Sequence, residues 1–306
     1  MAEKRKKLVF IENFILSGSA AVISKTSIAP LERVKLLIQN QDELIKLGRL
    51  SKSYNGIIDC AITTFKSEGI LSFWRSNFIN CVRYFPTQAL NFAFKDHIKG
   101  AFHSSPGESH ARKLAKNIFS GSTAGALSNC FVYSLDYART RLAMDAKFSG
   151  IGKSDRQFTG VIDVYKKTWA ADGIAGLYRG FSVSIVSIMV YRGFYFGLYD
   201  SLKPVLLTEN SGILVSFALG YSVTVTANLL AYPLDTIRRR MMLRSCEKVQ
   251  YRNALDCASQ IYKQEGAMSF MKGAGANIIR NIAGAGVLVL FDRSKDIYLQ
   301  WQHSRL

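Results

Sequence analysis

Charged residues recur in one pattern at three well-separated places in the chain. In each copy a helix-breaking residue and a hydrophobic residue precede an acid, and a base follows three positions later. The copies are Pro30-Leu31-Glu32-Arg33-Val34-Lys35, Ser134-Leu135-Asp136-Tyr137-Ala138-Arg139 and Pro233-Leu234-Asp235-Thr236-Ile237-Arg238. An acid and a base at this spacing lie on one face of a helix, and a preceding proline kinks or breaks that helix. Three such helix ends predict a threefold assembly that ion pairs can close, which is the chemistry of a gate.

A second acid–base pattern ends each of the three segments. Its members are Asp96 and Lys99, Asp200 and Lys203, and Asp292 and Lys295. Between the two charged patterns, each segment contains an aromatic–small corner, an acid–glycine pair and a corner with a basic residue at its centre. These elements are, in order, Tyr54-Asn55-Gly56, Phe158-Thr159-Gly160 and Tyr251-Arg252-Asn253; Glu68-Gly69, Asp172-Gly173 and Glu265-Gly266; and Trp74-Arg75-Ser76, Tyr178-Arg179-Gly180 and Met271-Lys272-Gly273. Such self-similarity indicates a chain built from three repeats.

The repeats predict an all-α membrane protein with two spans per repeat, joined by a short surface helix. We place the six transmembrane helices near residues 10–40, 76–99, 113–145, 178–203, 212–243 and 273–299. We place a basic tail at 1–9 and the repeats at 10–105, 106–206 and 207–306. Ser211–Leu234 and Asn117–Leu135 carry no charged residue and reach the roughly 18–20 residues that cross a bilayer. Other spans carry Arg or Lys near their middle, and these side chains must face a wet interior because a charge in lipid is costly.

The composition calls for an anionic partner. Among 306 residues, 40 are Lys or Arg and 22 are Asp or Glu, which gives a formal net charge of +18. Such a charge attracts nucleic acid, anionic lipid or a charged small molecule, and the long apolar runs favour a membrane protein over a soluble nucleic-acid-binding protein. The five cysteines have no metal-ligand spacing and no disulfide pattern. The basic N-terminus lacks the features of a secretory or cleavable organelle signal, so we expect any targeting signal to be internal.

Basic residues also mark a site midway between the two charged patterns. Arg83 lies nine residues after Trp74, about 13 Å along a helix. The equivalent positions of the other repeats are Ser187 and Arg280, and Lys25 lies on the same helix face as the first acid. Two guanidiniums and an ammonium that converge there suit a polyphosphate, because Arg binds phosphate oxygens through a planar fork. The alternative is that these cations pair with acids inside the protein.

The triplicated pattern resembles the mitochondrial carrier family over about residues 10–299. Within that family, Arg238-Arg239-Arg240-Met241-Met242 looks like the signature of carriers that exchange ADP and ATP, as do Ser24-Lys25-Thr26 and the stretch from Arg83 to Asp96. The resemblance implies the mitochondrial carrier fold, six helices in three pseudo-threefold repeats, in the inner mitochondrial membrane or that of a mitochondrion-related organelle. It also implies antiport of cytosolic ADP for matrix ATP by alternating access, and no enzymatic activity.

The resemblance further implies a role for each charged set. At the matrix mouth, Glu32, Asp136 and Asp235 pair with Lys35, Arg139 and Arg238, and Gln39 braces them. At the cytoplasmic mouth, Asp96, Asp200 and Asp292 pair with Lys99, Lys203 and Lys295. Lys25, Arg83 and Arg280 contact the phosphates, and Ser187, Ile188, Tyr191 and Asn91 form the adenine side. The family implies cardiolipin as a bound lipid, no other cofactor, no metal, no nucleic acid and function as a monomer.

Some positions depart from the family pattern, and several alternatives stay open. The departures are Ser134 for Pro, Ser187 for Gly, Ala231 for Ser, Asn281-Ile282-Ala283-Gly284 for a glycine-rich run, and Ser76, Asn253 and Met271 at the corners that hold cardiolipin. They bear on the helix kink, selectivity and lipid contacts rather than on the class. The alternatives are a carrier of other nucleotides or of nucleotide with phosphate, a membrane-anchored protein that binds nucleic acid, and a proton leak. For the charged pairs the alternative is an ordinary solvated helix face, and for Tyr191 it is a packed aromatic.

Overall fold

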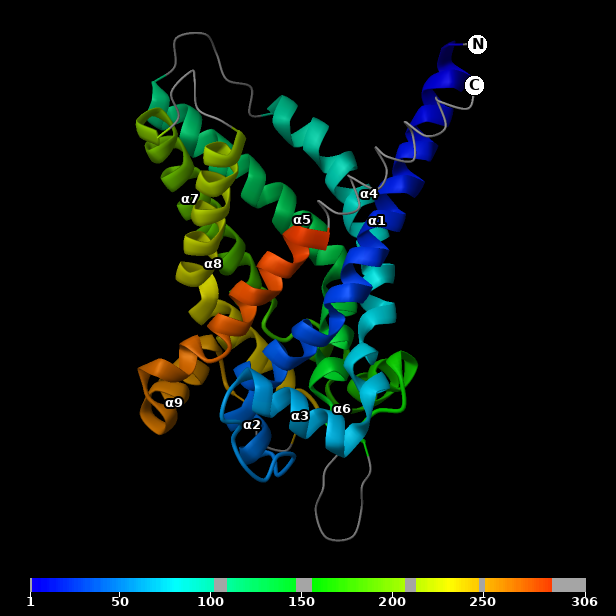
Figure 1. Ribbon diagram of the computed structural model, residues 1–306, viewed down its shortest axis with the longest axis vertical. Helices are drawn as coiled ribbons and strands as arrows, with labels where there is room; N and C mark the ends of the chain where they lie inside the picture. The colour runs from blue at the N-terminus through cyan, green and yellow to red at the C-terminus, as the bar shows by residue number, and fades with distance from the viewer. Residues whose placement is uncertain (1, 102–108, 147–155, 207–212, 248–250, 288–306) are drawn as a thin grey trace.

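The computed structural model describes residues 2–101, 109–146, 156–206, 213–247 and 251–287 (Figure 1). Within these ranges every regular element is a helix. The first repeat contributes the long helices α1 (Ala2–Gln39) and α4 (Asn77–Ala101), and the second contributes α5 (His110–Met144) and α7 (Phe181–Leu206). The third contributes α8 (Ile213–Leu243) and a helix over residues 274–287. The all-α fold with two long helices per repeat is therefore confirmed.

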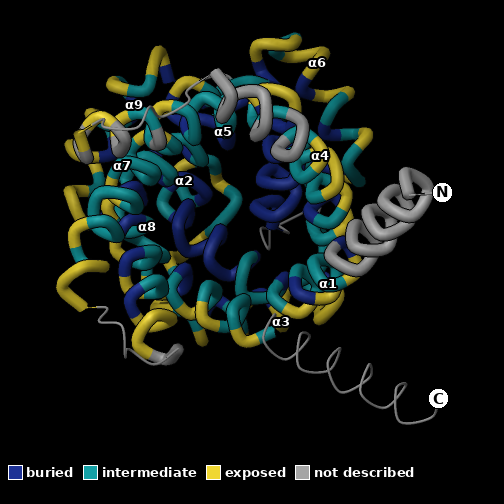
Figure 2. Tube along the Cα trace, turned by 90° about the horizontal axis from the view of Figure 1, so that it is seen from above, coloured by how far each residue is buried: buried dark blue, intermediate teal, exposed yellow. Residues whose placement is uncertain are grey.

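The long helices stand side by side as a ring. Contacts join α1 to α4, α4 to α5, α5 to α7 and α7 to α8, and Figure 2 shows the ring from above. In Figure 1 these helices diverge upward, away from the end of the molecule that carries the short helices. The predicted sixth span continues to residue 299, and its part beyond residue 287 lies outside the described residues.

Two of the long helices meet a simple length and hydropathy test for crossing a membrane. They are Phe181–Leu206, with a mean hydropathy of 1.4, and Val215–Leu243, with 1.3. The charge-free run at 117–135 does not bring α5 over the same threshold, because it contains several Ser, Asn, Thr and Gly residues that lower its hydropathy.

The prolines of the first and third charged motifs do not end their helices. α1 continues through Pro30 to Gln39, and α8 continues through Pro233 to Leu243. Proline removes one backbone hydrogen bond from a helix, and burial of the next two to three turns offsets that loss. Leu37 and Met242, for example, are fully buried. The charged residues after each proline consequently stay on a regular helical turn.

Three short helices lie at the periphery of the ring, as predicted (Figure 2). They are α3 (Ile57–Glu68), α6 (Val161–Leu177) and α9 (Ala254–Glu265). The glycine of each acid–glycine pair has a positive φ, with values of 80° at Gly69, 61° at Gly173 and 81° at Gly266. Glycine adopts this conformation without steric cost, and it ends α3 and α9 and interrupts α6.

Three further elements were not predicted. The 3₁₀ helices η1 (Ile70–Trp74) and η2 (Ala267–Met271) connect α3 and α9 to the next long helix. The six-residue helix α2 (Gln41–Lys46) follows α1 after a single residue. Its short length gives no periodic pattern, so nothing in its apolar spacing distinguishes it from a loop.

Glycines at two corners let one repeat approach the backbone of the next. Gly180 and Gly273 have φ values of 82° and 83°. A Cβ added to Gly180 would lie 3.1 Å from the Arg238 carbonyl oxygen, and one added to Gly273 would lie 3.1 Å from the Lys35 carbonyl oxygen. Any side chain at these corners would push the third repeat from the second and the first from the third. The first repeat has Ser76 at this position.

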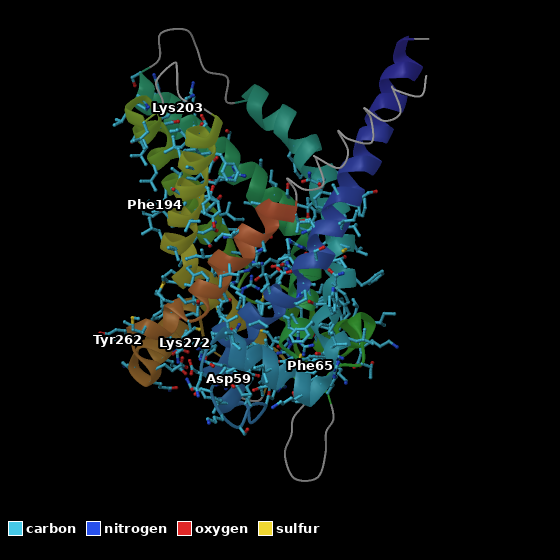
Figure 3. The ribbon with its side chains drawn as sticks, in the orientation of Figure 1. Asp59, Phe65, Phe194, Lys203, Tyr262 and Lys272 are labelled. Carbon is cyan, nitrogen blue, oxygen red and sulfur yellow. The ribbon has the colours of Figure 1, made fainter. Side chains whose placement is uncertain are left out.

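Apolar side chains on the outside of the ring are exposed rather than buried. Phe119 and Phe131 on α5 are each 63% exposed, and Phe194 on α7 is 42% exposed. Figure 3 shows Phe194 pointing away from the ring. A belt of exposed large hydrophobic residues suits contact with lipid, since a soluble protein exposes few such contiguous patches.

Candidate functional site

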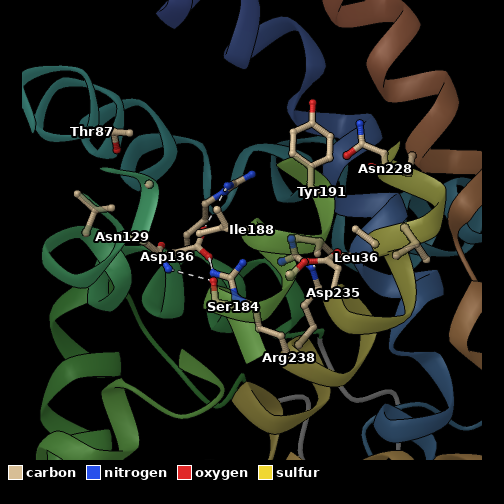
Figure 4. Close-up of a pocket in the computed structure, with 18 of the residues that line it drawn as sticks. Leu36, Thr87, Asn129, Asp136, Ser184, Ile188, Tyr191, Asn228, Asp235 and Arg238 are labelled. Carbon is tan, nitrogen blue, oxygen red and sulfur yellow. Dashed lines mark hydrogen bonds and ion pairs between the residues drawn. The ribbon is translucent and has the colours of Figure 1, made fainter. Parts of the chain in front are cut away.

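A cavity of about 500 Å³ lies between the long helices, and each of the six contributes to its wall (Figure 4). Arg83, Ser187, Ile188, Tyr191 and Arg280, which were predicted to contact a ligand, all line it. Three of them, Arg83, Ser187 and Arg280, are the equivalent positions of the three repeats. The structure therefore brings together the ring of positions that the repeat offset defines.

Lys25, which was also predicted to contact a ligand, lies on α1 but is not among the described residues that line the cavity. Its Nζ is 5.8 Å from the centroid of the Tyr84 ring on α4. That distance is within the range of a cation–π contact. Asn91 is part of α4, but its side chain lies outside the described residues. The predicted role of Asn91 therefore stays a prediction.

The cavity wall carries a surplus of positive charge. Seven cations line it: Lys35, Arg83, Arg139, Arg192, Arg238, Arg239 and Arg280. Three carboxylates line it: Glu32, Asp136 and Asp235. This leaves a formal excess of four positive charges in a confined space, where attraction to an anion is stronger than in bulk water.

Three ion pairs between helices form the floor of the cavity. Lys35 Nζ on α1 lies 2.9 Å from Asp235 Oδ2 on α8. Arg139 on α5 pairs with Glu32 on α1, and Arg238 on α8 pairs with Asp136 on α5. Each acid thus pairs with a base from another repeat, and the three pairs link α1, α5 and α8 in a closed triangle. Figure 4 shows Asp136, Asp235 and Arg238 below Tyr191 and Asn228 in the view.

Neutral side chains support this triangle from below. Gln39 Nε2 donates to Asp235 Oδ2 at 3.2 Å and to Thr236 Oγ1 at 3.0 Å. Asn80 Nδ2 on α4 donates to Glu32 Oε2 at 3.0 Å. Both amides are buried, so the carboxylates gain further hydrogen bonds where they have lost water. The glutamine predicted as a brace does contact the ion-pair triangle.

Arg83 and Arg239 also contact the acids of the floor. Arg83 Nη1 lies 3.7 Å from Asp136 Oδ1, and Arg239 Nε lies 2.9 Å from Asp235 Oδ2. Pairing with internal acids, the alternative raised for the basic residues of the site, therefore applies to Arg83. In the described part of the chain, Lys25 and Arg280 form no such ion pair.

The second charged ring falls largely outside the described residues. The side chains of Asp96 and Lys99, and the whole of Asp292 and Lys295, are not described. Asp200 and Lys203 lie near the other end of α7, and Figure 3 shows Lys203 at the top of the view. Lys203 Nζ is 5.9 Å from the centroid of the Tyr199 ring. A cytoplasmic network of six residues accordingly stays a prediction.

Arg240, the third arginine of the signature run, belongs to a different cluster. Its side chain is fully buried and contacts Glu265 Oε2 at 2.7 Å, Glu43 Oε2 at 3.2 Å and Asp42 Oδ2 at 3.4 Å. Burial alone would raise the pKa of Glu265, but hydrogen bonding and charge from Arg240 hold it well below its usual range. The carboxylates of α2 and α9 are thus tied to α8, beneath the ion-pair triangle. Arg240 is therefore paired with acids inside the protein.

Several cavity residues were not predicted. Arg192, Thr87, Asn129, Asn228 and Asn277 all line the wall. Asn129 Nδ2 donates to Ser184 Oγ at 3.0 Å, and Asn228 Nδ2 donates to the Thr224 carbonyl oxygen at 2.9 Å. The available signal was an amide inside an otherwise apolar, charge-free run. Within the described residues, no group of three His, Cys, Asp or Glu side chains could hold a metal ion.

The fold and this site define a class of membrane protein, and comparison with known proteins identifies it. The family model for mitochondrial carrier protein matches residues 6–106, 110–210 and 209–301. The chain therefore belongs to the mitochondrial carrier family.

Individual relatives are similar over nearly their whole length. An ADP,ATP carrier protein of Neurospora crassa is 56% identical over 299 residues, covering 96% of this chain and 95% of the relative. ADP,ATP carrier protein 3 of Saccharomyces cerevisiae is 56% identical, with 95% of each chain covered. ADP,ATP carrier protein 1, mitochondrial, of Triticum aestivum is 57% identical, covering 97% of this chain and 90% of the relative.

Proposed function

We propose that the chain is an antiporter that exchanges ADP for ATP, one for one, across the inner mitochondrial membrane. The observation that carries the proposal is the cavity between the long helices, whose wall has seven cationic side chains and three carboxylates. A confined surplus of positive charge suits a polyanion of nucleotide size. The names of relatives that are 56–57% identical support ADP and ATP as the exchanged pair.

The cavity wall and the helix beside it suggest how a nucleotide binds. Arg83 and Arg280 in the wall, together with Lys25 on α1, contact the phosphates, with guanidiniums supplying planar pairs of N–H donors. Tyr191 offers an aromatic face to the adenine ring, flanked by Ser187 and Ile188. Asn91 completes the adenine side in this proposal. Nucleotide binding to Arg83 competes with its contact to Asp136, which couples the ligand to the floor.

Alternating access follows from two charged rings that open in turn. In the matrix gate, Glu32, Asp136 and Asp235 separate from Lys35, Arg139 and Arg238, and Gln39 releases Asp235. The cytoplasmic ring of Asp96, Asp200 and Asp292 with Lys99, Lys203 and Lys295 forms at the same time. The bound nucleotide must interact more favourably with the intermediate than with either closed state, because only differential affinity shifts a conformational equilibrium.

Two associations belong to the same proposal. Cardiolipin binds at the outer corners where the short helices meet the long ones, its phosphates facing helix N-termini, which favour anions. The unit of transport is the monomer, since one chain supplies all three repeats around the cavity. Light scattering of the purified carrier, with the mass of bound lipid and detergent subtracted, tests the second point.

Transport into liposomes tests the exchange itself. Purified protein is reconstituted into vesicles loaded with ATP, and uptake of radiolabelled ADP is followed with GDP and inorganic phosphate as parallel substrates. We expect ADP uptake that depends on internal nucleotide, and its loss in Arg280→Ala protein whose thermal unfolding is unchanged. Uptake of GDP or phosphate in place of ADP would instead support a carrier of different selectivity, a role that Ser187 and Ala231 in the cavity wall would favour. Salt-sensitive DNA binding without transport would overturn the proposal.

A further inference from the structure

The guanidinium of Arg280 is held by two asparagines of its own helix. Its Nε and Nη2 donate to Asn277 Oδ1 at 3.3 and 3.1 Å, and its Nη2 donates to Asn281 Oδ1 at 2.6 Å. Asn277 is buried and lines the cavity with Arg280. The side chain is therefore fixed from behind by amide oxygens.

Other guanidiniums of the cavity are held differently. Arg139 pairs with Glu32, Arg238 pairs with Asp136, and Arg239 Nε lies 2.9 Å from Asp235 Oδ2. Each of these cations is largely neutralised by its partner. In the part of the chain that the structure describes, Arg280 forms no ion pair, so it keeps its full charge.

Because its partners are neutral amides rather than carboxylates, the Arg280 guanidinium is held in place without losing its charge. A guanidinium has five N–H donors, and the hydrogen bonds to Asn277 and Asn281 use the donors of Nε and Nη2. Among the residues that the structure describes, no group accepts a hydrogen bond from Nη1, so its two donors stay available for a ligand. A neutral acceptor fixes the orientation of the group without cancelling its attraction for an anion, whereas a carboxylate would do both.

We propose that Asn281, together with Asn277, is a positioning residue that orients the Arg280 guanidinium toward the nucleotide phosphates while leaving its charge intact. The inference rests on the exchange activity proposed above. Asn281 follows Arg280 directly and begins the run that replaces the glycine-rich sequence of the family pattern. A glycine at this position would supply no acceptor, so the shortest of the three hydrogen bonds is particular to asparagine here.

The isosteric change Asn281→Asp separates orientation from charge. Aspartate keeps an acceptor at the same distance but adds a negative charge beside Arg280, so it neutralises the cation. Asn281→Ala removes the acceptor and leaves the charge. We expect the KM for ADP to rise by about 3-fold in Asn281→Ala, the equivalent of one neutral hydrogen bond. In Asn281→Asp the KM should rise by about 10-fold or more, as expected when a charge-assisted contact is weakened, while kcat changes little in both.

Lys52→Gln is the matched control, because Lys52 is exposed in the loop before α3 and lies away from the cavity. It makes the net charge more negative by the same one unit and should leave the KM unchanged. Thermal unfolding of each variant in detergent verifies that the fold is retained.

A KM for Asn281→Asp equal to or below that of Asn281→Ala would overturn the inference. If the hydrogen bond from Arg280 to residue 281 had only a structural role, the aspartate of Asn281→Asp, as the stronger acceptor, would preserve it, and the KM would not rise above that of Asn281→Ala. If the unmodified protein moves no ADP at all, the proposed exchange fails instead, and the two failures are thereby distinguished.

Discussion

Asp235 accepts hydrogen bonds from three side chains at one carboxylate oxygen. Lys35 Nζ and Arg239 Nε lie 2.9 Å from its Oδ2, and Gln39 Nε2 lies at 3.2 Å. Asp235→Asn should leave Lys35 and Arg239 without their counter-charge in a buried place, and removal of one partner from a buried pair costs about 3–5 kcal/mol. The Asp235 side chain is 22% exposed, so we expect a loss near the lower end, measured as a reduced free energy of unfolding in detergent.

The exposed pair on α6 provides the control for this substitution. Lys167 Nζ lies 2.8 Å from Asp163 Oδ2, with the Lys167 side chain 50% exposed. Asp163→Asn should change the free energy of unfolding by less than about 1 kcal/mol, as is usual for surface pairs. Equal losses of unfolding free energy in Asp235→Asn and Asp163→Asn would show that burial does not make the Asp235 ion pairs more stabilising than a surface pair.

At the scale of single residues, the sequence predicts charged groups better than neutral ones. Glu32, Asp136 and Asp235 were predicted because an acid and a base recur at a fixed spacing three times. Asn277 and Asn281 were not, since an amide has no spacing rule and its partner, Arg280, is visible only once the helix is built. The closing partners of each acid are also a property of the assembled helices, because spacing alone does not say which neighbouring repeat supplies the base.

Among the helices, α2 depends on one buried carboxylate. Glu43 is fully buried and accepts hydrogen bonds from Arg240, Arg244 and Tyr251, the last at 2.7 Å from the Tyr251 hydroxyl. Burial and the nearby charge of Glu43 raise the pKa of Tyr251 well above its usual range. The tyrosine therefore stays a neutral donor, and α2 of the first repeat is tied to the third repeat.

Replacement of this carboxylate should loosen α2. Glu43→Gln keeps the shape but removes the charge that offsets two guanidiniums, so we expect α2 to open locally and tryptic cleavage at Lys46 to accelerate. Glu247→Gln is the control, since Glu247 pairs with Arg49 and its side chain is 23% exposed. Cleavage at Lys46 at the same rate in both variants and in the unmodified protein would contradict the role assigned to Glu43.

The tie between α9 and α8 should depend on pH. Arg240 contacts hold the pKa of Glu265 far below the ordinary value of 4.5, although burial alone would raise it. A depressed carboxyl pKa stabilises the fold fully above the unfolded value, and this contribution is lost as pH falls toward the folded value. Above about pH 5, we therefore expect the contribution of Glu265 to the thermal unfolding temperature to be constant. At lower pH, the unfolding temperature should decline.

Glu265→Gln provides the comparison for that pH dependence. The variant should be less stable than the unmodified protein at neutral pH, and the difference should shrink as pH is lowered below the ordinary glutamic acid value. If the stability difference between Glu265→Gln and the unmodified protein stays constant from neutral to acid pH, the ionised form of Glu265 makes no contribution to stability. Stability measured by thermal unfolding in one detergent at fixed salt keeps screening constant.

Some of the helices can be predicted from the sequence and others cannot. The long helices and α3, α6 and α9 are predictable because repeats reinforce a weak signal at equivalent positions. The predicted span at 10–40 already runs through Pro30, but the packing of Leu36 and Leu37 that holds the helix together there depends on other elements and is visible only in the structure. The helix α2 is too short for periodicity, and its stability comes from residues of the third repeat that are distant in sequence.

For the whole molecule, the charge inventory of the cavity leads to a prediction about driving force. The fixed charges of the protein face the same nucleotide site in both directions of exchange, so they cancel over a complete cycle. Free ATP carries one more negative charge than free ADP, and each exchange consequently moves one net charge across the membrane. The work is about 2.3 kcal/mol per 100 mV, which corresponds to about a 50-fold shift in the equilibrium ratio.

This electrical work is measurable in vesicles with an imposed potassium diffusion potential. With magnesium absent, an inside-positive potential of about 100 mV should enrich ATP over ADP inside by about 50-fold relative to vesicles without a potential. Collapse of the potential with an ionophore should abolish the enrichment while one-for-one exchange continues. Because the surplus of cations in the cavity stays with the protein, Asn281→Asp should slow exchange at low substrate without changing the equilibrium ratio. A ratio that ignores the potential would mean that a compensating charge moves with ADP or ATP, and the exchange would then be electroneutral.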